Sequence, residues 1–281
     1  MSTIQNQFIG IFDSGVGGLS VSREIHRLLP QAPVYYIADQ AHVPYGKRQL
    51  DEIFTFSLAI SRFLISKGAA VIVVACNTAS AAALSALRET LPGTPFVGME
   101  PAVKPATLQT ESGIVGVLAT PATFQGRMYS TLVERFAQNV RLLTNTLPGL
   151  VEAVERGELD APETRRILEA AIKPMLAEGA DTLVLGCTHF PFVLPLIREI
   201  AGPDVKVIDP APAIARRTAY LLEQGAITFV DNGEARTAYA TTGNLKKFKN
   251  AIHNLLNIES KPVQLAWNDT SDQLTEMRSQ A

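Results

Sequence analysis

The sequence predicts an α/β protein of two similar α/β domains, each a mostly parallel sheet flanked by helices, with a functional site in the cleft between them. Short apolar runs alternate with helical patterns along most of the 281 residues, which is typical of parallel sheets covered by helices on both faces. That length corresponds to about two domains at roughly 150 residues each. Residues 73–78 also resemble residues 184–189, and residues 9–13 resemble 116–120, so two halves of one design are expected.

Elements of the first half follow from two patterns. Strands are predicted where Val- and Ile-rich runs are too short for a helix and end at Gly, Pro or polar residues. Helices are predicted where apolar residues recur every three or four positions, as Ile53, Phe56, Ile60 and Phe63 do. In chain order we expect a strand at 8–12, a helix at 19–29, a strand at 34–38, a helix at 49–67, a strand at 70–75, a helix at 79–88 and a strand at 96–98.

The same alternation restarts after Gly98 and changes again near Pro210. In between we expect a strand at 114–119, a helix at 122–136, a strand at 140–143, helices at 150–156 and 162–178, a strand at 182–186, a helix at 192–200 and a strand at 205–208. After Pro210 we expect one more helix, a strand at 236–241, a helix at 245–255 and a last strand at 262–265. Residues from about Trp267 onward are polar and are expected to be frayed.

Composition excludes several classes of protein. With 47% hydrophobic and 19% charged residues the balance is globular, and 25 basic against 27 acidic residues give a net charge of -2. Without a basic excess, a nucleic-acid partner is not expected. The longest apolar stretch, around 69–75, is too short to span a bilayer, and the first residues lack a secretory signal. We expect a cytoplasmic protein with a small-molecule ligand and no membrane partner.

Small polar residues follow four of the predicted strands. These segments are 13–15, 76–78, 120–123 and 187–189. In open α/β sheets, ligands bind outside the carboxyl ends of strands, and the free N–H groups of the helices that follow attract anions. The sequence therefore predicts a ligand that carries carboxylates, held by the neutral donors Ser14, Asn77, Thr78, Thr120, Thr123 and Thr188.

The two cysteines, Cys76 and Cys187, occupy matching sites in the two halves. A helix N-terminus is expected to lower the pKa of each thiol. One thiol on each side of a ligand can invert a tetrahedral carbon, because one base removes a proton from one face and an acid delivers a proton to the other. His189 lies two residues beyond Cys187, so in extended geometry it can exchange the thiol proton. Asp13 can serve Cys76 in the same way.

Two other sites are weighed against this one. The run from Gly15 to Gly18 fails as a dinucleotide loop because position 20 is Ser, and no Gly-Lys-Ser/Thr follows for a P-loop. A zinc site is not expected, because only Cys187 and His189 are close together and the other three histidines are scattered. We therefore expect no metal.

Four motifs in order carry a family resemblance. They are GIFDSGVGGL at 10–19, PYG at 44–46, ACNTA at 75–79 and LGCTHFP at 185–191, with weaker matches at 98–101 and 207–210. With them the sequence resembles the glutamate racemases, cofactor-independent two-cysteine members of the aspartate/glutamate racemase family. The resemblance runs from residue 9 to about 210, and the remaining part fits more loosely.

The resemblance implies roles and an organisation. Cys76 would act on D-glutamate with help from Asp13, and Cys187 on L-glutamate with help from His189. No cofactor would be needed, the D-glutamate product would supply peptidoglycan synthesis, and a homodimer is an expectation from the family alone. The chain would return to its first domain after about Pro210, giving domains of 1–98 plus 211–281 and of 99–210. Substrate would be held by Asp13, Ser14, Tyr45, Gly46, Asn77, Thr78, Thr123, Thr188 and His189.

The sequence departs from the family pattern at two places. Glu155 aligns with a supporting carboxylate, but Glu152 replaces a usual Pro nearby, so either could have that role. Gly126 stands where Ser is usual.

Three alternative functions stay open. A racemase of aspartate or another amino acid is one, although aspartate-type relatives carry Glu where this sequence has His189, which favours glutamate. A two-lobed protein that binds an acidic amino acid without reacting it would not need paired thiols. A redox dithiol would need both sulfurs within disulfide reach, whereas bases that flank an amino acid lie too far apart.

Overall fold

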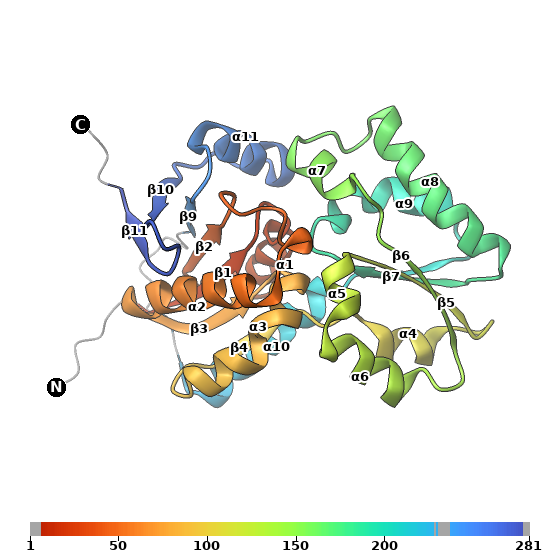
Figure 1. Ribbon diagram of the computed structural model, residues 1–281, viewed down its shortest axis with the longest axis horizontal. Helices are drawn as coiled ribbons and strands as arrows, with labels where there is room; N and C mark the ends of the chain where they lie inside the picture. The colour runs from red at the N-terminus through yellow and green to blue at the C-terminus, as the bar shows by residue number, and fades with distance from the viewer. Residues whose placement is uncertain (1–6, 228, 230–236, 278–281) are drawn as a thin grey trace.

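The computed structural model describes residues 7–227, 229 and 237–277, and it contains two β-sheets (Figure 1). Their strands are β1 (Phe8–Asp13), β2 (Val34–Ala38), β3 (Ala69–Val74), β4 (Phe96–Gly98), β5 (Ile114–Ala119), β6 (Arg141–Asn145), β7 (Thr182–Gly186), β8 (Lys206–Ile208), β9 (Thr237–Thr241), β10 (Val263–Trp267) and β11 (Leu274–Glu276). The seven-stranded sheet has the order β11-β10-β9-β2-β1-β3-β4, and the four-stranded sheet has the order β6-β5-β7-β8. Neighbouring strands are parallel except β10 and β11. The predicted α/β class is confirmed.

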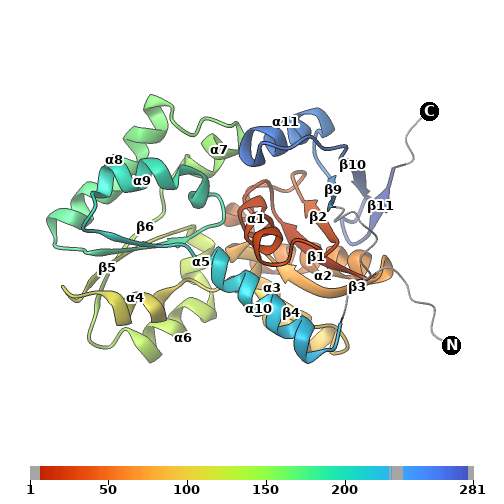
Figure 2. The same ribbon diagram turned by 180° about the vertical axis from the view of Figure 1, so that it is seen from behind.

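Helices cover both faces of each sheet. They are α1 (Leu19–Leu28), α2 (Leu50–Ser66), α3 (Asn77–Thr90), α4 (Val103–Gln109), α5 (Pro121–Gln125), α6 (Arg127–Phe136), α7 (Leu150–Glu155), α8 (Pro162–Ala177), α9 (Leu194–Ala201), α10 (Ala211–Gln224) and α11 (Leu245–Leu256), with 3-10 turns η1 (Tyr45–Lys47) and η2 (Phe190–Val193). Around the seven-stranded sheet, α2 and α3 pack together on one face and α1, α10 and α11 on the other (Figures 1 and 2). Around the four-stranded sheet, α4 and α6 lie opposite α8 and α9. We call these assemblies the large-sheet half and the small-sheet half.

Most elements form where the sequence pattern predicts them, with four corrections. The helix expected at 122–136 is two helices, because the backbone at Gly126 is extended. A Cβ at this position would lie 2.8 Å from the Cβ of Ala81, so the glycine lets the break pack closely against α3. The helix expected at 192–200 starts instead as the turn η2, which contains Pro191.

The C-terminal prediction also needs correction. Residues beyond Trp267 are not simply frayed, since β11 pairs antiparallel with β10 and Leu274 is buried against the core. That pairing gives an otherwise parallel sheet an antiparallel edge, a common feature of such sheets. The helix α4 has no counterpart in the sequence prediction. Arg236, the first residue of the strand expected at 236–241, lies outside the described residues.

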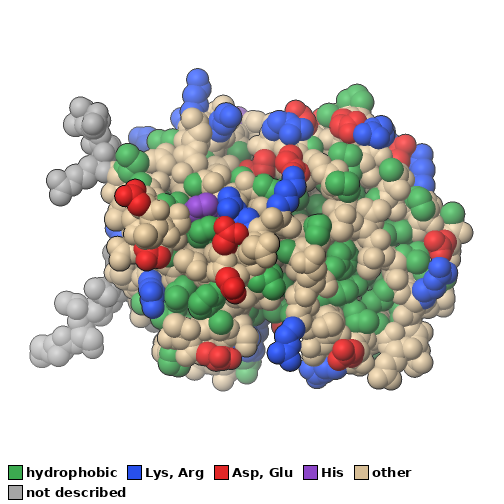
Figure 3. All heavy atoms as spheres, viewed as in Figure 1, with side chains coloured by type: hydrophobic (Ala, Val, Ile, Leu, Met, Phe, Trp, Pro, Cys, Tyr) green, Lys and Arg blue, Asp and Glu red, His purple; other side chains and the backbone are tan. Residues whose placement is uncertain are grey.

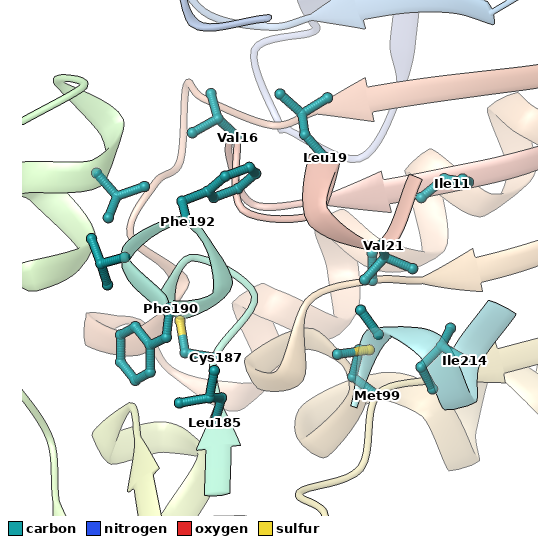
Figure 4. Close-up of a cluster of buried hydrophobic side chains, with 14 of the residues drawn as sticks. Ile11, Val16, Leu19, Val21, Met99, Leu185, Cys187, Phe190, Phe192 and Ile214 are labelled. Atoms are coloured by element: carbon teal, nitrogen blue, oxygen red, sulfur yellow. The ribbon is translucent and has the colours of Figure 1, made fainter. Parts of the chain in front are cut away.

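One hydrophobic cluster runs through both halves. It includes Val16 and Leu19 from the large-sheet half and Leu185 and Phe190 from the small-sheet half. Figure 4 shows Phe192 of η2 between Val16 and Leu19 on one side and Phe190 on the other. The halves are therefore joined by buried apolar surface as well as by the chain.

The central strands of both sheets end at the boundary between the halves. Phe12 of β1 pairs with Val74 of β3, and Ala119 of β5 pairs with Gly186 of β7, so each pair of strands ends at the same level. This shared level places the polar segments that follow the strands opposite one another, as the sequence analysis expected.

Candidate active site

A pocket of about 140 Å³ lies at this boundary and is lined by side chains from both halves. Its size suits a small molecule, since sites for drug-sized ligands occupy about 300–1,000 Å³. Both cysteines line it. Of the predicted substrate-binding residues, seven line the pocket: Ser14, Tyr45, Gly46, Asn77, Thr78, Thr188 and His189.

Cys76 is the residue that caps the N-terminus of α3. The Ala79 N–H donates to its Sγ at 3.4 Å, and the thiol donates to Ser14 Oγ at 3.8 Å. Burial of the thiol, with the nearby charge of Asp13, raises the pKa of Cys76 to about 12. The expectation that a helix N-terminus lowers this pKa is therefore wrong, because loss of hydration outweighs the single N–H bond.

Cys187 follows β7 and contacts an imidazole. Its Sγ lies 3.6 Å from His189 Nδ1, and His189 Nε2 lies 2.7 Å from Glu155 Oε1. The segment is a turn with His189 in helical backbone geometry, not the extended chain expected from sequence. The turn nevertheless brings ring and sulfur together. We call Cys187, His189 and Glu155 the His189 relay.

Charges within the His189 relay stabilise each other. Burial alone lowers the pKa of His189, but hydrogen bonds and charges of Cys187 and Glu155 raise it well above its ordinary value. Burial alone raises the pKa of Glu155, but the hydrogen bond and charge of His189, with other donors, lower it overall. The buried imidazolium and carboxylate therefore form a matched pair.

The structure separates the two glutamates that the sequence left open. Glu155 contacts His189 and also accepts from the backbone N–H of Val16 at 2.8 Å. Glu152 instead pairs with Lys47 across the pocket, with 2.7 Å between Nζ and Oε1. Only Glu155 is thus in a position to act through the imidazole.

Asp13 lies buried behind the pocket. Its Oδ1 accepts from the Gly15 N–H at 2.8 Å, and its Oδ2 accepts from Thr188 Oγ1 at 2.9 Å, so it joins the two halves. Burial raises the pKa of Asp13 despite the opposing charge of His189. Among the hydrogen bonds of the described residues none joins Asp13 to Cys76, and its predicted partnership with that thiol stays a prediction.

Neutral donors gather around the pocket. Thr78 Oγ1 lies 2.8 Å from Thr120 Oγ1, which lies 2.9 Å from Thr123 Oγ1, so a chain of hydroxyls crosses between the halves. Thr123 reaches the pocket only through Thr120. The amide of Asn77 is buried, and neither of its polar atoms has a hydrogen-bond partner among the described residues. A buried amide without partners is costly unless a ligand satisfies it.

The glycine run after β1 has a packing reason that the sequence analysis did not find. A Cβ at position 15 would lie 1.9 Å from Glu155 Oε1, and one at position 17 would lie 2.5 Å from His189 Nδ1. The glycines therefore let the backbone approach the His189 relay. The run forms part of the candidate site, although it is no nucleotide loop.

A second cluster fixes the loop at 44–46. Buried Asp39 accepts from Tyr45 Oη, Thr242 Oγ1 and Trp267 Nε1, each at 2.7 Å, and lies 2.9 Å from His42 Nδ1. Tyr45 lines the pocket, so these bonds connect it to the end of β10. The sequence does not reveal this cluster because Thr242 and Trp267 are more than 200 residues from Asp39.

Segment 146–149 also lines the pocket. Leu147 has a φ of 42°, unusual for a residue with a side chain, and Gly149 has a φ of 90°. The Asn145 side chain supports this turn by accepting from the Leu147 N–H at 2.9 Å. No sequence rule marks a leucine for such a conformation.

On the face drawn in Figure 3, side chains of both signs are intermingled. Across the described ranges no three His, Cys, Asp or Glu side chains are grouped as in a metal site. Of the helices that the structure describes, none is both long and apolar enough to cross a membrane.

Comparisons with known proteins place this chain in a family of racemases. The Asp/Glu/Hydantoin racemase family model matches residues 9–218. A glutamate racemase of Roseiflexus sp. (strain RS-1) is 50% identical over 248 residues, which cover 88% of this chain and 91% of that protein.

Solved structures agree with the sequence comparisons. A Bacillus anthracis glutamate racemase superposes with a TM-score of 0.81 at 32% identity, covering 92% of this chain and 97% of that one. A Francisella tularensis glutamate racemase in complex with D-glutamate gives 0.80 at 28% identity, with the same coverage. The chain therefore belongs to the Asp/Glu/Hydantoin racemase family. Within that family it groups with the glutamate racemases, which confirms the resemblance noted in the sequence.

Proposed function

We propose that this glutamate racemase inverts the Cα of glutamate with Cys76 and Cys187 as its two acid–base groups. One observation carries the proposal: the two thiols come from different halves of the molecule and line one small pocket. A binding protein for an acidic amino acid would have no use for this pair. The product D-glutamate supplies peptidoglycan synthesis, the role of glutamate racemases.

The reaction follows from one proton transfer at each thiol. For L-glutamate, the Cys187 thiolate takes the Cα proton and becomes a thiol, and the electron pair stays on the substrate as a carbanion. The Cys76 thiol then gives its proton to the opposite face, leaving a thiolate and D-glutamate. Each thiol acts as a general acid or a general base. A positioned group in such a role raises the reaction rate by about 10²–10⁴-fold. The reverse reaction exchanges the two roles.

Substrate carboxylates match the neutral donors of the pocket. The unpartnered Asn77 amide and the hydroxyls of Ser14 and Thr78 offer hydrogen bonds without a fixed positive charge, and Thr188, whose hydroxyl donates to Asp13, can accept one. The same proposal includes contacts to Tyr45, Gly46, Thr123, His189 and Asp13. Because the carbanion is stabilised through its carboxylate, preorganised donors there favour the transition state over the ground state. No step needs a cofactor.

The proposal extends to domain organisation and assembly. Domains of 1–98 plus 211–281 and of 99–210 are supported by the sheets, since β9, β10 and β11 belong to the same sheet as β1. Sedimentation at micromolar concentration tests the homodimer that the family suggests. Cytoplasmic location stays a prediction that fractionation of the source cells tests.

Hydrogen exchange at Cα gives the direct test. L-Glutamate is incubated with enzyme in D2O without added cofactor, and the Cα proton signal is followed by NMR together with the optical rotation. We expect both the Cα proton signal and the optical rotation to decay. Aspartate and other amino acids are run in parallel. If one of them turns over faster than glutamate, that amino acid is the preferred substrate and the proposal for glutamate is wrong.

Cysteine variants then separate the two thiols. Cys76→Ser should stop racemisation while Cys187 still exchanges the Cα proton of bound L-glutamate, and Cys187→Ser should spare exchange into D-glutamate instead. Glutamate binding, followed by calorimetry, should change little in either variant. Full racemase activity in either variant would contradict the two-thiol mechanism.

A further inference from the structure

The carboxylate of Glu155 is held from the large-sheet half by a side chain that has no role in the mechanism above. Gln40 follows β2, and its Nε2 donates to Glu155 Oε2 at 3.0 Å. The other oxygen, Oε1, receives the Val16 N–H and His189. Each carboxylate oxygen therefore has its own partners, and Gln40 is the side-chain donor to the oxygen that faces away from the imidazole.

A chain of donors fixes which end of the Gln40 amide faces Glu155. The Gly243 N–H donates to Thr241 Oγ1 at 3.0 Å, so the hydroxyl is free to donate onward, and it does so to Gln40 Oε1 at 3.0 Å. With its oxygen occupied in this way, the amide presents its NH2 group to Glu155. A Cβ at position 243 would lie 2.5 Å from the Cβ of Gln40, so the glycine makes this approach feasible.

The orientation of Glu155 in turn decides where the proton of His189 lies. A carboxylate that accepts from Nε2 fixes the ring orientation and leaves Nδ1 to exchange a proton with Cys187 Sγ at 3.6 Å. In metal sites, partners of this indirect kind change function by about 10–100-fold although they touch no substrate. Gln40 stands one residue further out, since it reaches Cys187 through Glu155 and His189.

The Gln40 contact also crosses the boundary between the halves. Gln40, Thr241 and Gly243 belong to the large-sheet half, while Glu155 ends α7 in the small-sheet half. The amide can therefore hold the carboxylate only when the halves are together. Figures 1 and 2 both show α11, which follows this loop, beside α7.

We propose that Gln40 is a positioning residue that, with Thr241, orients Glu155 across the boundary and thereby sets the proton position on His189 for Cys187. This inference rests on the proposed two-thiol function. Proton transfer at Cys187 then depends on the large-sheet half, because that half supplies the Gln40 amide that holds Glu155 of the His189 relay.

Gln40→Met tests the proposal with a side chain of similar length and no hydrogen-bonding group. We expect kcat to fall about tenfold and KM to stay within about twofold, because a hydrogen bond to a charged group is lost away from the substrate. In ¹⁵N-histidine-labelled protein, which has four histidines, the titration of the His189 ring should move to lower pH. This second readout needs no turnover, so it distinguishes failure of the Gln40 inference from failure of the racemase proposal.

Gln40→Glu removes the NH2 donor to Glu155 and leaves the rest of the side chain almost unchanged in size. It keeps an oxygen for Thr241 but sets a second carboxylate against Glu155, so its activity relative to the wild type should rise as the pH falls and one proton is shared between the two. Thr241→Val should lower kcat less than Gln40→Met does, and Thr241→Ser should restore it.

Gln264→Met is the matched control, because its Nε2 donates to the backbone oxygen of Thr241 at 3.2 Å without touching Glu155. We expect its kcat and its His189 titration to match the wild type. If Gln40→Met folds and keeps both unchanged, the proposal is overturned. If Gln40→Met fails to fold, a Thr241→Val variant with unchanged kcat and His189 titration overturns it instead. Equal losses in Gln264→Met would also overturn it, since they would mark a general packing effect.

Discussion

The two thiols of the pocket have unequal surroundings. Cys187 has an imidazole at 3.6 Å and a carboxylate behind it, whereas Cys76 has a serine hydroxyl, one backbone N–H and a nearby aspartate that disfavours the thiolate. The reaction proposed for them is symmetric, since L- and D-glutamate are mirror images. Under that proposal, a symmetric reaction uses two half-sites with different electrostatics.

This difference bears on the resting enzyme. With the pKa of Cys76 raised to about 12, that sulfur holds its proton at neutral pH, while the Cys187 proton can be shared with His189. An acid on the Cys76 side and a base on the Cys187 side is the state that L-glutamate requires. In the proposed mechanism D-glutamate requires the opposite arrangement, with a thiolate at Cys76, which burial disfavours.

Alkylation should reveal the largest contrast. A pKa of about 12 in place of 9.0 leaves Cys76 with about 10³-fold less thiolate than an ordinary thiol near neutral pH. Iodoacetamide should modify Cys187 first, and the rate at Cys76 should rise about tenfold per pH unit between pH 7 and 10. Mass spectrometry of the two cysteine peptides measures this, with Cys76→Ser as the control. If Cys76 were modified before Cys187 at pH 7, the proposed difference in reactivity between the two thiols would be contradicted.

Removing the imidazole should make the half-sites more alike. His189→Asn takes away the group that exchanges a proton with Cys187, so we expect kcat/KM to fall about 10²-fold. The loss must be equal from L- and D-glutamate, because mirror images have equal free energies in water. Ser14→Ala is the matching change beside Cys76 and should cost less than tenfold. A larger loss in Ser14→Ala would reverse our ranking of the two sides.

The glycine run offers a third test. Gly15→Ala places a methyl group against Glu155 Oε1, so the buried carboxylate must give up its bonds to Val16 and His189. We therefore expect about tenfold lower kcat together with a drop in melting temperature of about a few degrees, because a buried charge pair is disturbed. Gly93→Ala is the control, since nothing lies within 4 Å of a Cβ there. A large drop in melting temperature with normal activity would show that the glycine serves the fold instead.

The smallest effect is expected at the mouth of the pocket. The Lys47 and Glu152 side chains are 74% and 33% exposed, so their ion pair contributes at most about 1 kcal/mol. Lys47→Met should raise KM about threefold, because it loosens the contact between the halves and leaves a carboxylate near an anionic substrate. Lys206→Met removes a similar exposed pair with Glu111 and should leave KM unchanged. An unchanged KM in Lys47→Met would mean that the pair does not affect substrate entry.

Much of the fold could be predicted because, in most elements, the local sequence pattern indicates the same structure that packing in the folded protein requires. β2, β4, β5 and β7 match their predicted bounds, since short buried strands between glycines and polar residues have few alternatives. The break at Gly126 could not be predicted, because its cause is the approach of Ala81 from another helix. Leu274 was missed for a similar reason, since its strand depends on pairing with β10.

The candidate site shows the same division. The two cysteines and the polar residues after the strands were found because parallel topology gathers strand ends. The direction of the Cys76 pKa was predicted wrongly, because burial is a tertiary property that a helix-capping position does not reveal. Gln40 carries no signal in the sequence, since its meaning comes from Thr241 and Glu155, which are 201 and 115 residues away.

The Asp39 cluster also gives this protein a built-in optical probe. Trp267 is its single tryptophan, and the indole N–H donates to the same carboxylate that receives the hydroxyl of pocket-lining Tyr45. Indole emission responds to hydrogen bonding and local polarity, so movement of the loop at 44–46 would register as a change in intrinsic fluorescence. Ligand arrival can then be timed in a stopped-flow instrument on unlabelled enzyme, independently of any assay for chirality.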